Sequence, residues 1–155
     1  HHLNVIKDNI EYLTNSKVII SILAKVTIKD LNSQSSLPNY YRLMPNTAVE
    51  YCQSASLIVY KNKDQQVESI LSQLGSLTEV NENQMDAGSV LCSCQTAFAM
   101  RYLRAAMQAG VEMGLKPHQA LDISAQVLQG AATIIQKKLV VILSKKLTKQ
   151  PLRVV

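Results

Sequence analysis

Apolar positions in the first eighty residues alternate between two kinds of spacing. Within 4–14 they recur at the spacing of one helix face. Residues 17–23 instead form a short β-branched run, which is typical of a fully buried parallel strand. The other predicted elements are a helical turn at 27–31 with Thr27 as its N-cap, a loop at 32–39, strands at 40–44, 55–60 and 76–80, and an amphipathic helix at 65–74 that Gly75 ends. This alternation predicts an α/β fold.

The pattern changes at Asn81. Residues 83–109 contain no proline, and their apolar side chains predict one long helix. A second stripe of Met100, Leu103 and Met107 makes that helix apolar on most sides, so it must be buried on most sides. One short chain offers too few neighbours, so we expect burial in an oligomer. Gly110 and Gly114 are predicted to end this helix, and Pro117 to begin another whose stripe runs to Ile135.

Composition and charge narrow the class of protein. The chain has 155 residues, 47% hydrophobic and 17% charged, which suits one globular domain or two small ones. No apolar run approaches the ~20 residues of a membrane span, and no secretory signal is visible. Three cysteines argue against a disulfide framework, so a cytoplasmic protein is expected.

The net charge of +5 belongs to the end of the sequence. From Lys137 onward there are six basic residues and no acid, which leaves 10 basic and 11 acidic groups in residues 1–136. A nucleic-acid-binding body is therefore not favoured. The segment 137–155 could be a solvated terminus, a packed element around its LVVIL run, or an arm that binds lipid or nucleic acid.

The sequence holds few candidates for chemistry. Its five glycines cannot form a G-x-G-x-x-G turn or a P-loop. Cys92 and Cys94 would point roughly 200° apart on a helix, which disfavours joint chelation, and we predict no metal site. Glu79 and Asp86 are interpreted as solvated charges near the start of the long helix. Arg101 and Arg104 could bind an anion, although pairing with acids of a partner helix is favoured.

One stretch of the sequence indicates a protein family more specifically than these candidate residues do. Residues 41–48, Y-R-L-M-P-N-T-A, resemble the R-x-M-P-N-T-P segment of pyrroline-5-carboxylate reductases. Further segments resemble that family in the same order: I-I-S-I-L-A-K-V at 19–26, M-D-A through A-F at 85–98, Q-A-G-V-E-M-G-L at 108–115, and A-Q through G-A-A at 125–132. Cys94 and the run A-F-A-M-R-Y at 97–102 are similar to a bacterial variant.

The resemblance implies a fold and an activity. The family reduces 1-pyrroline-5-carboxylate to proline with hydride from NADPH or NADH. We therefore expect the C-terminal part of a Rossmann-like dinucleotide domain at 1–81. An all-α dimerisation domain of long interlocking helices, with a basic tail, is expected at 82–155. A homodimer or higher homo-oligomer is expected, with a small-molecule substrate and neither nucleic acid nor membrane as a partner.

Carried over from the family, the residues at the nicotinamide end of the cofactor are Leu23, Ala24, Met44, Pro45 and Asn46. Lys25 replaces a family glycine and Ala48 the final proline of the motif. The family's glycine-rich pyrophosphate turn and its substrate-carboxylate turn have no counterpart in the 155 residues. We therefore name no catalytic residue and predict that the isolated chain is inactive. The alternatives are a non-catalytic helical dimerisation module and, from residues 137–155 alone, a basic-tail anion binder.

Overall fold

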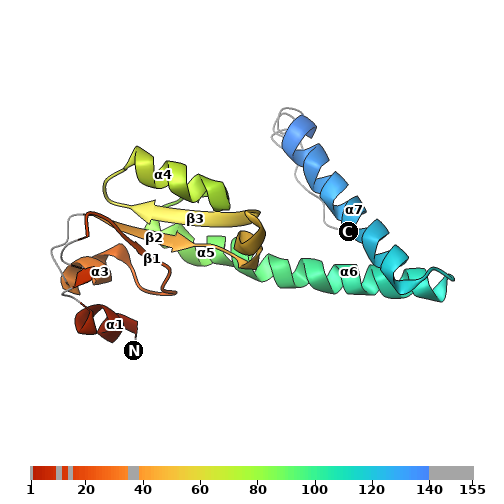
Figure 1. The fold of residues 1–155 in the computed structure, drawn as a ribbon, viewed down its shortest axis with the longest axis horizontal. Coiled ribbons are helices and arrows are strands. Elements are labelled where there is room, and N and C mark those ends of the chain that lie inside the picture. Colours follow the sequence, from red (N-terminus) through yellow and green to blue (C-terminus); the bar gives the residue numbers. More distant parts are fainter. Residues whose placement is uncertain (1, 10–11, 14–15, 35–38, 140–155) are drawn as a thin grey trace. The chain divides into compact units, whose positions relative to one another are not determined.

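The fold was analysed in a computed structural model, which describes residues 2–9, 12–13, 16–34 and 39–139 (Figure 1). Contacts divide the chain into two compact units, residues 1–98 and residues 99–155. The last sixteen residues, which include most of the LVVIL run, lie outside the described part. Among the described residues, no helix combines the length and the hydrophobicity that crossing a bilayer requires.

A mixed sheet forms the centre of the first unit. Its strands are β1 (Ile19–Ser21), β2 (Tyr40–Met44), β3 (Ser54–Tyr60) and β4 (Gly75–Glu79), and they lie side by side in that order. β1 runs parallel to β2, β2 antiparallel to β3, and β3 parallel to β4. Each strand predicted from the sequence is present, and β2 has the predicted bounds. β1 is less buried than predicted, since Ile20 is 41% exposed.

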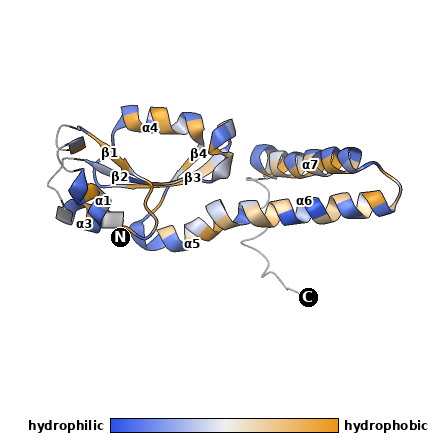
Figure 2. Cartoon of the chain, turned by 60° about the horizontal axis from the view of Figure 1, so that its bottom comes forward, coloured by the Kyte–Doolittle hydropathy of each residue, from blue (hydrophilic) through white to orange (hydrophobic). Residues whose placement is uncertain are grey.

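Helices cover both faces of this sheet (Figure 2). On one face, α4 (Gln65–Leu71) packs Val67 and Leu71 against Tyr41, Leu43 and Ile58. On the other face, α1 (His2–Asp8) and α3 (Ile28–Gln34) form a second core in which Leu31 and Tyr40 are buried. Tyr40 and Tyr41 point to opposite faces because successive side chains alternate along a strand. Burial on both faces stabilises the sheet through two separate cores.

The start of α3 confirms the cap predicted at Thr27. The Asp30 backbone N–H donates to Thr27 Oγ1 at 3.1 Å, and the Thr27 backbone N–H donates to Asp30 Oδ2 at 2.9 Å. This reciprocal pair is a capping box. The Thr27 hydroxyl and N–H hold the pKa of the Asp30 carboxyl below its ordinary value. The helix continues to Gln34, beyond the predicted end at residue 31.

The predicted long helix is interrupted near its start. A 3-10 turn (Glu82–Gln84) leads into α5 (Met85–Ser89), a π-helical turn follows at Val90–Cys94, and α6 spans Gln95–Glu112. Gly88 lies against Leu57 of β3, because a Cβ added at residue 88 would come within 2.4 Å of Leu57 Cδ1. α5 therefore packs closely on the sheet, within the first unit.

The second unit holds the rest of α6 and α7 (Pro117–Ile134). The prediction that Gly110 ends the first helix is wrong, since α6 continues to Glu112. Gly110 is instead buried, and a Cβ added there would lie 2.8 Å from Ala120 Cβ, so glycine permits close packing at the turn. Gly114, at φ 97°, follows the helix end, and Pro117 stands in the first turn of α7 as predicted.

The apolar side chains of the second unit remain largely exposed. Among its described residues only Gly110 and Ala120 are buried. Met113 is 80% exposed and Val127 is 59% exposed. The other large apolar side chains that α6 and α7 expose in this unit are Met100, Tyr102, Val111, Leu121, Ile123 and Ile134. In the single chain, the long helix that the sequence predicted to be apolar on most sides exposes Met100 and Tyr102, and its predicted burial in an oligomer stays a prediction.

Candidate cofactor site

Three segments of the first unit meet around a cavity of about 380 Å³. The turn after β1 contributes Ile22 and Ala24, and the end of β2 contributes Met44 and Pro45. The end of α5 and the π-helical turn contribute the rest of the lining, Ser89, Ser93 and Cys94. The structure thus brings together three of the five predicted cofactor residues, although they come from two separate motifs.

The other two predicted residues have different surroundings. Leu23 packs against the core of α1 and α3, and it lines a separate, largely apolar cavity of about 270 Å³ between α1 and β1. Asn46 follows the end of β2, and its side chain is hydrogen-bonded to backbone groups. Their role as cofactor contacts stays a prediction.

The turn after β1 has an unusual backbone. Lys25 adopts φ 60°, in the left-handed region that glycine enters most readily, and the resembling family has glycine at this position. A side chain there costs on the order of 1 kcal/mol. The turn is held at its start, where the Leu23 backbone N–H donates to Ser21 Oγ at 3.3 Å. At its other end Val26 is buried, so Ala24 is fixed between two anchored residues.

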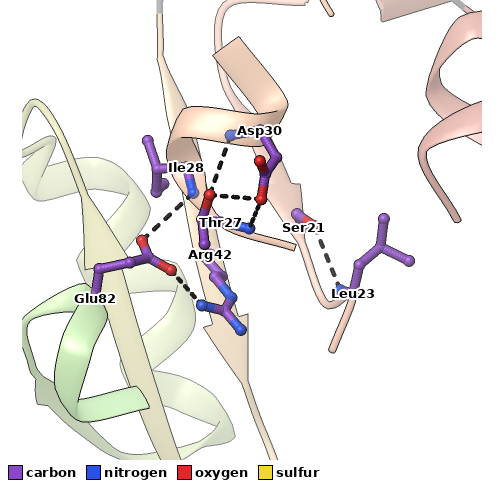
Figure 3. Close-up of polar contacts among 7 residues, drawn as sticks. All are labelled: Ser21, Leu23, Thr27, Ile28, Asp30, Arg42 and Glu82. Carbon is purple, nitrogen blue, oxygen red and sulfur yellow. Dashed lines mark hydrogen bonds and ion pairs between the residues drawn. The ribbon is translucent and has the colours of Figure 1, made fainter. Parts of the chain in front are cut away.

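A polar cluster joins β2 to the start of α3 and to the residues that precede α5 (Figure 3). Arg42 of β2 is 2% exposed, and its guanidinium forms an ion pair with Glu82. The second carboxylate oxygen of Glu82 accepts a hydrogen bond from the Ile28 backbone N–H at 3.4 Å. Glu82 therefore connects β2, the start of α3 and the residues that lead into α5.

Sequence reasoning missed Glu82 as a contributor to the site's framework. The available signal was Arg42, a charged residue inside a strand that is otherwise apolar and buried. A buried guanidinium requires an acid, because an unpaired charge in the interior is costly. Nothing in the spacing indicated which of the eleven acids would supply it, since Glu82 lies forty residues away.

The cavity lining is neutral. Its polar side-chain groups are the hydroxyls of Ser89 and Ser93 and the thiol of Cys94, and no charged side chain lines it. Such a surface fits a flat, uncharged ring such as nicotinamide better than a phosphate, which requires cationic groups or free backbone N–H groups. The lining therefore fits the nicotinamide end of a dinucleotide, while the described residues contain no glycine-rich turn for the pyrophosphate.

The remaining candidate groups have other environments. Cys52, Cys92 and Cys94 are free thiols, and burial raises the pKa of Cys92. Among the residues the structure describes, no group of three or more His, Cys, Asp or Glu side chains is placed to hold a metal ion. Glu79 is exposed, as predicted for a solvated charge, but it does not lie at the helix start. It lies in β4 and accepts the Tyr60 hydroxyl at 2.5 Å, which raises the pKa of Tyr60 to about 12.

The sequence is similar to those of known proteins. Residues 82–150 match a family profile described as pyrroline-5-carboxylate reductase dimerisation. Pyrroline-5-carboxylate reductase 2 of Dictyostelium discoideum is 34% identical over 152 residues, which cover 84% of this chain and 50% of that protein. The Neurospora crassa reductase is 32% identical over 136 residues, which cover 78% of this chain and 41% of that protein.

Solved structures share the fold. The pyrroline-5-carboxylate reductase of Streptococcus pyogenes matches with a TM-score of 0.74 at 19% identity, over 96% of this chain and 60% of that one. The Plasmodium falciparum pyrroline carboxylate reductase, solved with NADP bound, matches with a TM-score of 0.72 at 21% identity, over 95% of this chain and 60% of that one.

Fold and site together define a class of protein, in which part of a Rossmann-like domain precedes long helices of a dimerisation domain. Residues 82–150 match the dimerisation domain of pyrroline-5-carboxylate reductases, and most of the chain is similar in sequence to curated reductases of that name. The resemblance noted in the sequence and the predicted fold class are therefore confirmed. The chain spans about half the length of the curated relatives it matches.

Proposed function

We propose that this chain supplies the nicotinamide end of the cofactor site and the subunit interface of an NAD(P)H-dependent pyrroline-5-carboxylate reductase. The observation that carries the proposal is the neutral cavity in which Ala24, Met44 and Pro45 meet Ser93 and Cys94. The reduced cofactor, NADPH or NADH, would supply a hydride to the C=N carbon of 1-pyrroline-5-carboxylate, and the ring nitrogen would take a proton from solvent, which gives proline. The lining residues would hold the nicotinamide ring, orient one of its faces and keep water from the other.

The side chains that line the cavity offer different groups to a ligand. Ala24, Met44 and Pro45 offer apolar surface to a ring, and Met44 is held in the sheet by its pairing with Leu57. Ser93 offers a hydroxyl that can donate to a carboxamide or a carboxylate, whereas the Ser89 hydroxyl already donates to the Asp86 carbonyl and can only accept. No side chain is assigned a proton-transfer role, because the lining holds no carboxylate or histidine.

The proposal includes a homodimer or higher homo-oligomer. Its support is the match of residues 82–150 to a dimerisation profile and the exposed apolar side chains of α6 and α7. The proposal also places the protein in the cytoplasm, since its three free thiols suit a reducing compartment. We expect neither nucleic acid nor membrane as a partner, because residues 1–136 carry 10 basic and 11 acidic groups.

A second candidate is a helical dimerisation module without catalysis. The absence of a glycine-rich turn from these 155 residues favours it, because the pyrophosphate would lack its usual backbone donors. Both candidates expect no steady oxidation of NADPH when the 155-residue chain is mixed with 1-pyrroline-5-carboxylate. Turnover under these conditions, with a full-length reductase as positive control, would contradict the prediction that the isolated chain is inactive.

Binding of reduced nicotinamide mononucleotide separates the two candidates, because this ligand lacks the second nucleotide. We expect saturable binding by the 155-residue chain, followed through the fluorescence of the dihydronicotinamide. Ala24→Trp should abolish binding by filling the cavity, whereas Ala87→Trp, on the exposed side of α5, should leave it intact. Failure of the wild-type chain to bind would favour the non-catalytic module.

A further inference from the structure

The polar atoms of the Asn46 side chain bond to backbone groups of the chain itself, unlike those of a residue that contacts a cofactor. Its Oδ1 accepts a hydrogen bond from the Ala48 backbone N–H at 2.9 Å, which caps the 3-10 turn Thr47–Tyr51. Its Nδ2 donates to the Cys92 backbone carbonyl at 2.9 Å. Both ends of the carboxamide are therefore engaged with backbone groups, and the one at Cys92 lies forty-six residues from Asn46 in the sequence.

The carbonyl that Asn46 contacts belongs to the π-helical turn Val90–Cys94. In this turn the Gln95 N–H donates to the Val90 carbonyl, five residues back, so the turn holds one residue more than an α-helical turn. Such turns are rare and frequently occur at functional sites. Here the turn carries Ser93 and Cys94, which line the candidate cavity opposite Met44 and Pro45.

The same loop is also fixed to the sheet. The Asn46 backbone N–H donates to Ser54 Oγ at 3.0 Å, and Ser54 is 1% exposed and shares a hydrogen bond with Ser56 Oγ. Asn46 is thus anchored to a buried part of β3 while its side chain extends to the helix. A rigid anchor on one side lets a single hydrogen bond set the position of the other side.

We propose that Asn46 is a positioning residue, which holds the π-helical turn 90–94 against the end of β2 and so sets the width of the cavity. Its effect on a ligand is indirect, through Ser93 and Cys94. The inference rests on the proposed function for the identity of that ligand, whereas the link itself is a property of the folded chain.

The test compares substitutions that separate the two hydrogen bonds of the side chain. Asn46→Asp keeps an acceptor for the Ala48 N–H but removes the donor to Cys92. Asn46→Ser also keeps a capping oxygen, and it is too short to reach the helix. Asn81→Asp is the matched control, because it makes the same chemical change at an exposed residue that precedes the 3-10 turn Glu82–Gln84.

The measurement is the rate of alkylation of each cysteine by iodoacetamide, resolved by mass spectrometry. In the wild type the half-buried Cys92 should react far more slowly than the exposed Cys52 and Cys94. In both Asn46 variants we expect Cys92 to react about tenfold faster, the effect of losing one hydrogen bond on local opening. Cys52, which ends the capped 3-10 turn, should keep its rate.

Each outcome decides the inference. An unchanged Cys92 rate in the Asn46 variants overturns the positioning role. Equal acceleration of Cys52 and Cys92 overturns it too, because the side chain would then support the whole fold. A third outcome is that Cys92 reacts faster in the Asn46 variants while the wild-type chain fails to bind reduced nicotinamide mononucleotide. That result would support the positioning role and contradict the proposed function. Faster alkylation of Cys92 together with weaker binding of that ligand by the Asn46 variants supports both the positioning role and the proposed function.

Discussion

The two units of this chain differ in where their apolar side chains find partners. In residues 1–98 a sheet buries side chains on both faces, and Leu31, Tyr41 and Ile58 are at most 1% exposed. In residues 99–139 two long helices bury only Gly110 and Ala120 at the turn that joins them. The first unit buries a core of its own, whereas the described residues of the second unit leave most of their large apolar side chains exposed.

The difference has a geometric origin. A sheet offers two broad faces, so short helices on each side suffice to exclude water. A single pair of helices has one shared seam, and apolar residues on the remaining sides stay in solvent. The second unit therefore exposes the apolar surface that the proposed interface needs, and the first contains the proposed cofactor site.

The largest expected effect comes from a substitution that disrupts self-association through the second unit. Val127→Asp places a charge on the exposed apolar side of α7, and burying an unpaired charge at an interface is strongly unfavourable. We expect self-association to weaken by about a hundredfold or more, measured by sedimentation. Gln129→Asp, at an exposed polar position of the same helix, is the control and should change little.

The next effect tests the core of the first unit. Ile58→Ala removes a side chain that is 1% exposed, and it should lower the free energy of unfolding by about 2–5 kcal/mol. Ile70→Ala, at a position 62% exposed on α4, should cost less than about 0.5 kcal/mol. Urea unfolding followed by circular dichroism gives both values. Equal costs would mean that the core is not where the structure places it.

Two glycines of the second unit differ in how closely other atoms pack around them. Gly110→Ala forces a methyl group to within 2.8 Å of Ala120 Cβ, so we expect a loss of about 1–3 kcal/mol. Gly130 has no atom within 4 Å of an added Cβ, and Gly130→Ala should stabilise the helix by about 0.5–1 kcal/mol. Opposite signs in thermal unfolding are the expected result. Destabilisation by Gly130→Ala would indicate a close neighbour from another subunit.

The smallest effects concern the cap of α3. Thr27→Ala should cost about 1 kcal/mol at neutral pH, in urea unfolding, by removing the N-cap.

The cap also predicts a pH dependence. Because the folded-state pKa of Asp30 lies below its unfolded value, its contribution is present above the unfolded pKa of about 3.8 and is lost as the pH falls through the folded pKa. The difference between the wild type and Thr27→Ala should therefore shrink below pH 3.8. A difference that stayed constant to pH 2 would show that Asp30 does not take part in the cap.

Much of the fold could be predicted from the sequence, because local patterns determine it. Short, largely apolar runs located all four strands, and the Thr27 and Pro117 signals located helix starts. Gly110 was misinterpreted because a glycine that ends a helix and one that admits a neighbouring Ala120 look alike in a sequence. The π-helical turn at 90–94 was also missed, and its hydrogen bond with Asn46 joins segments forty-six residues apart in the sequence.

The candidate site was less accessible to sequence reasoning. The motif resemblance selected Ala24, Met44 and Pro45, which line one cavity, but it also selected Leu23, which packs into a core. A motif records which residues accompany a function and not which of them face the ligand. The link from Glu82 to Arg42 and Ile28 joins segments far apart in the sequence, and only the folded chain shows it.

The account depends most on the claim that another copy of the chain completes the second unit. Light scattering of the purified 155-residue chain at micromolar concentration tests it most directly, because mass is measured independently of shape. The account predicts a mass of at least twice the 17.1 kDa of one chain. A stable species of 17.1 kDa with folded α6 and α7 would contradict it.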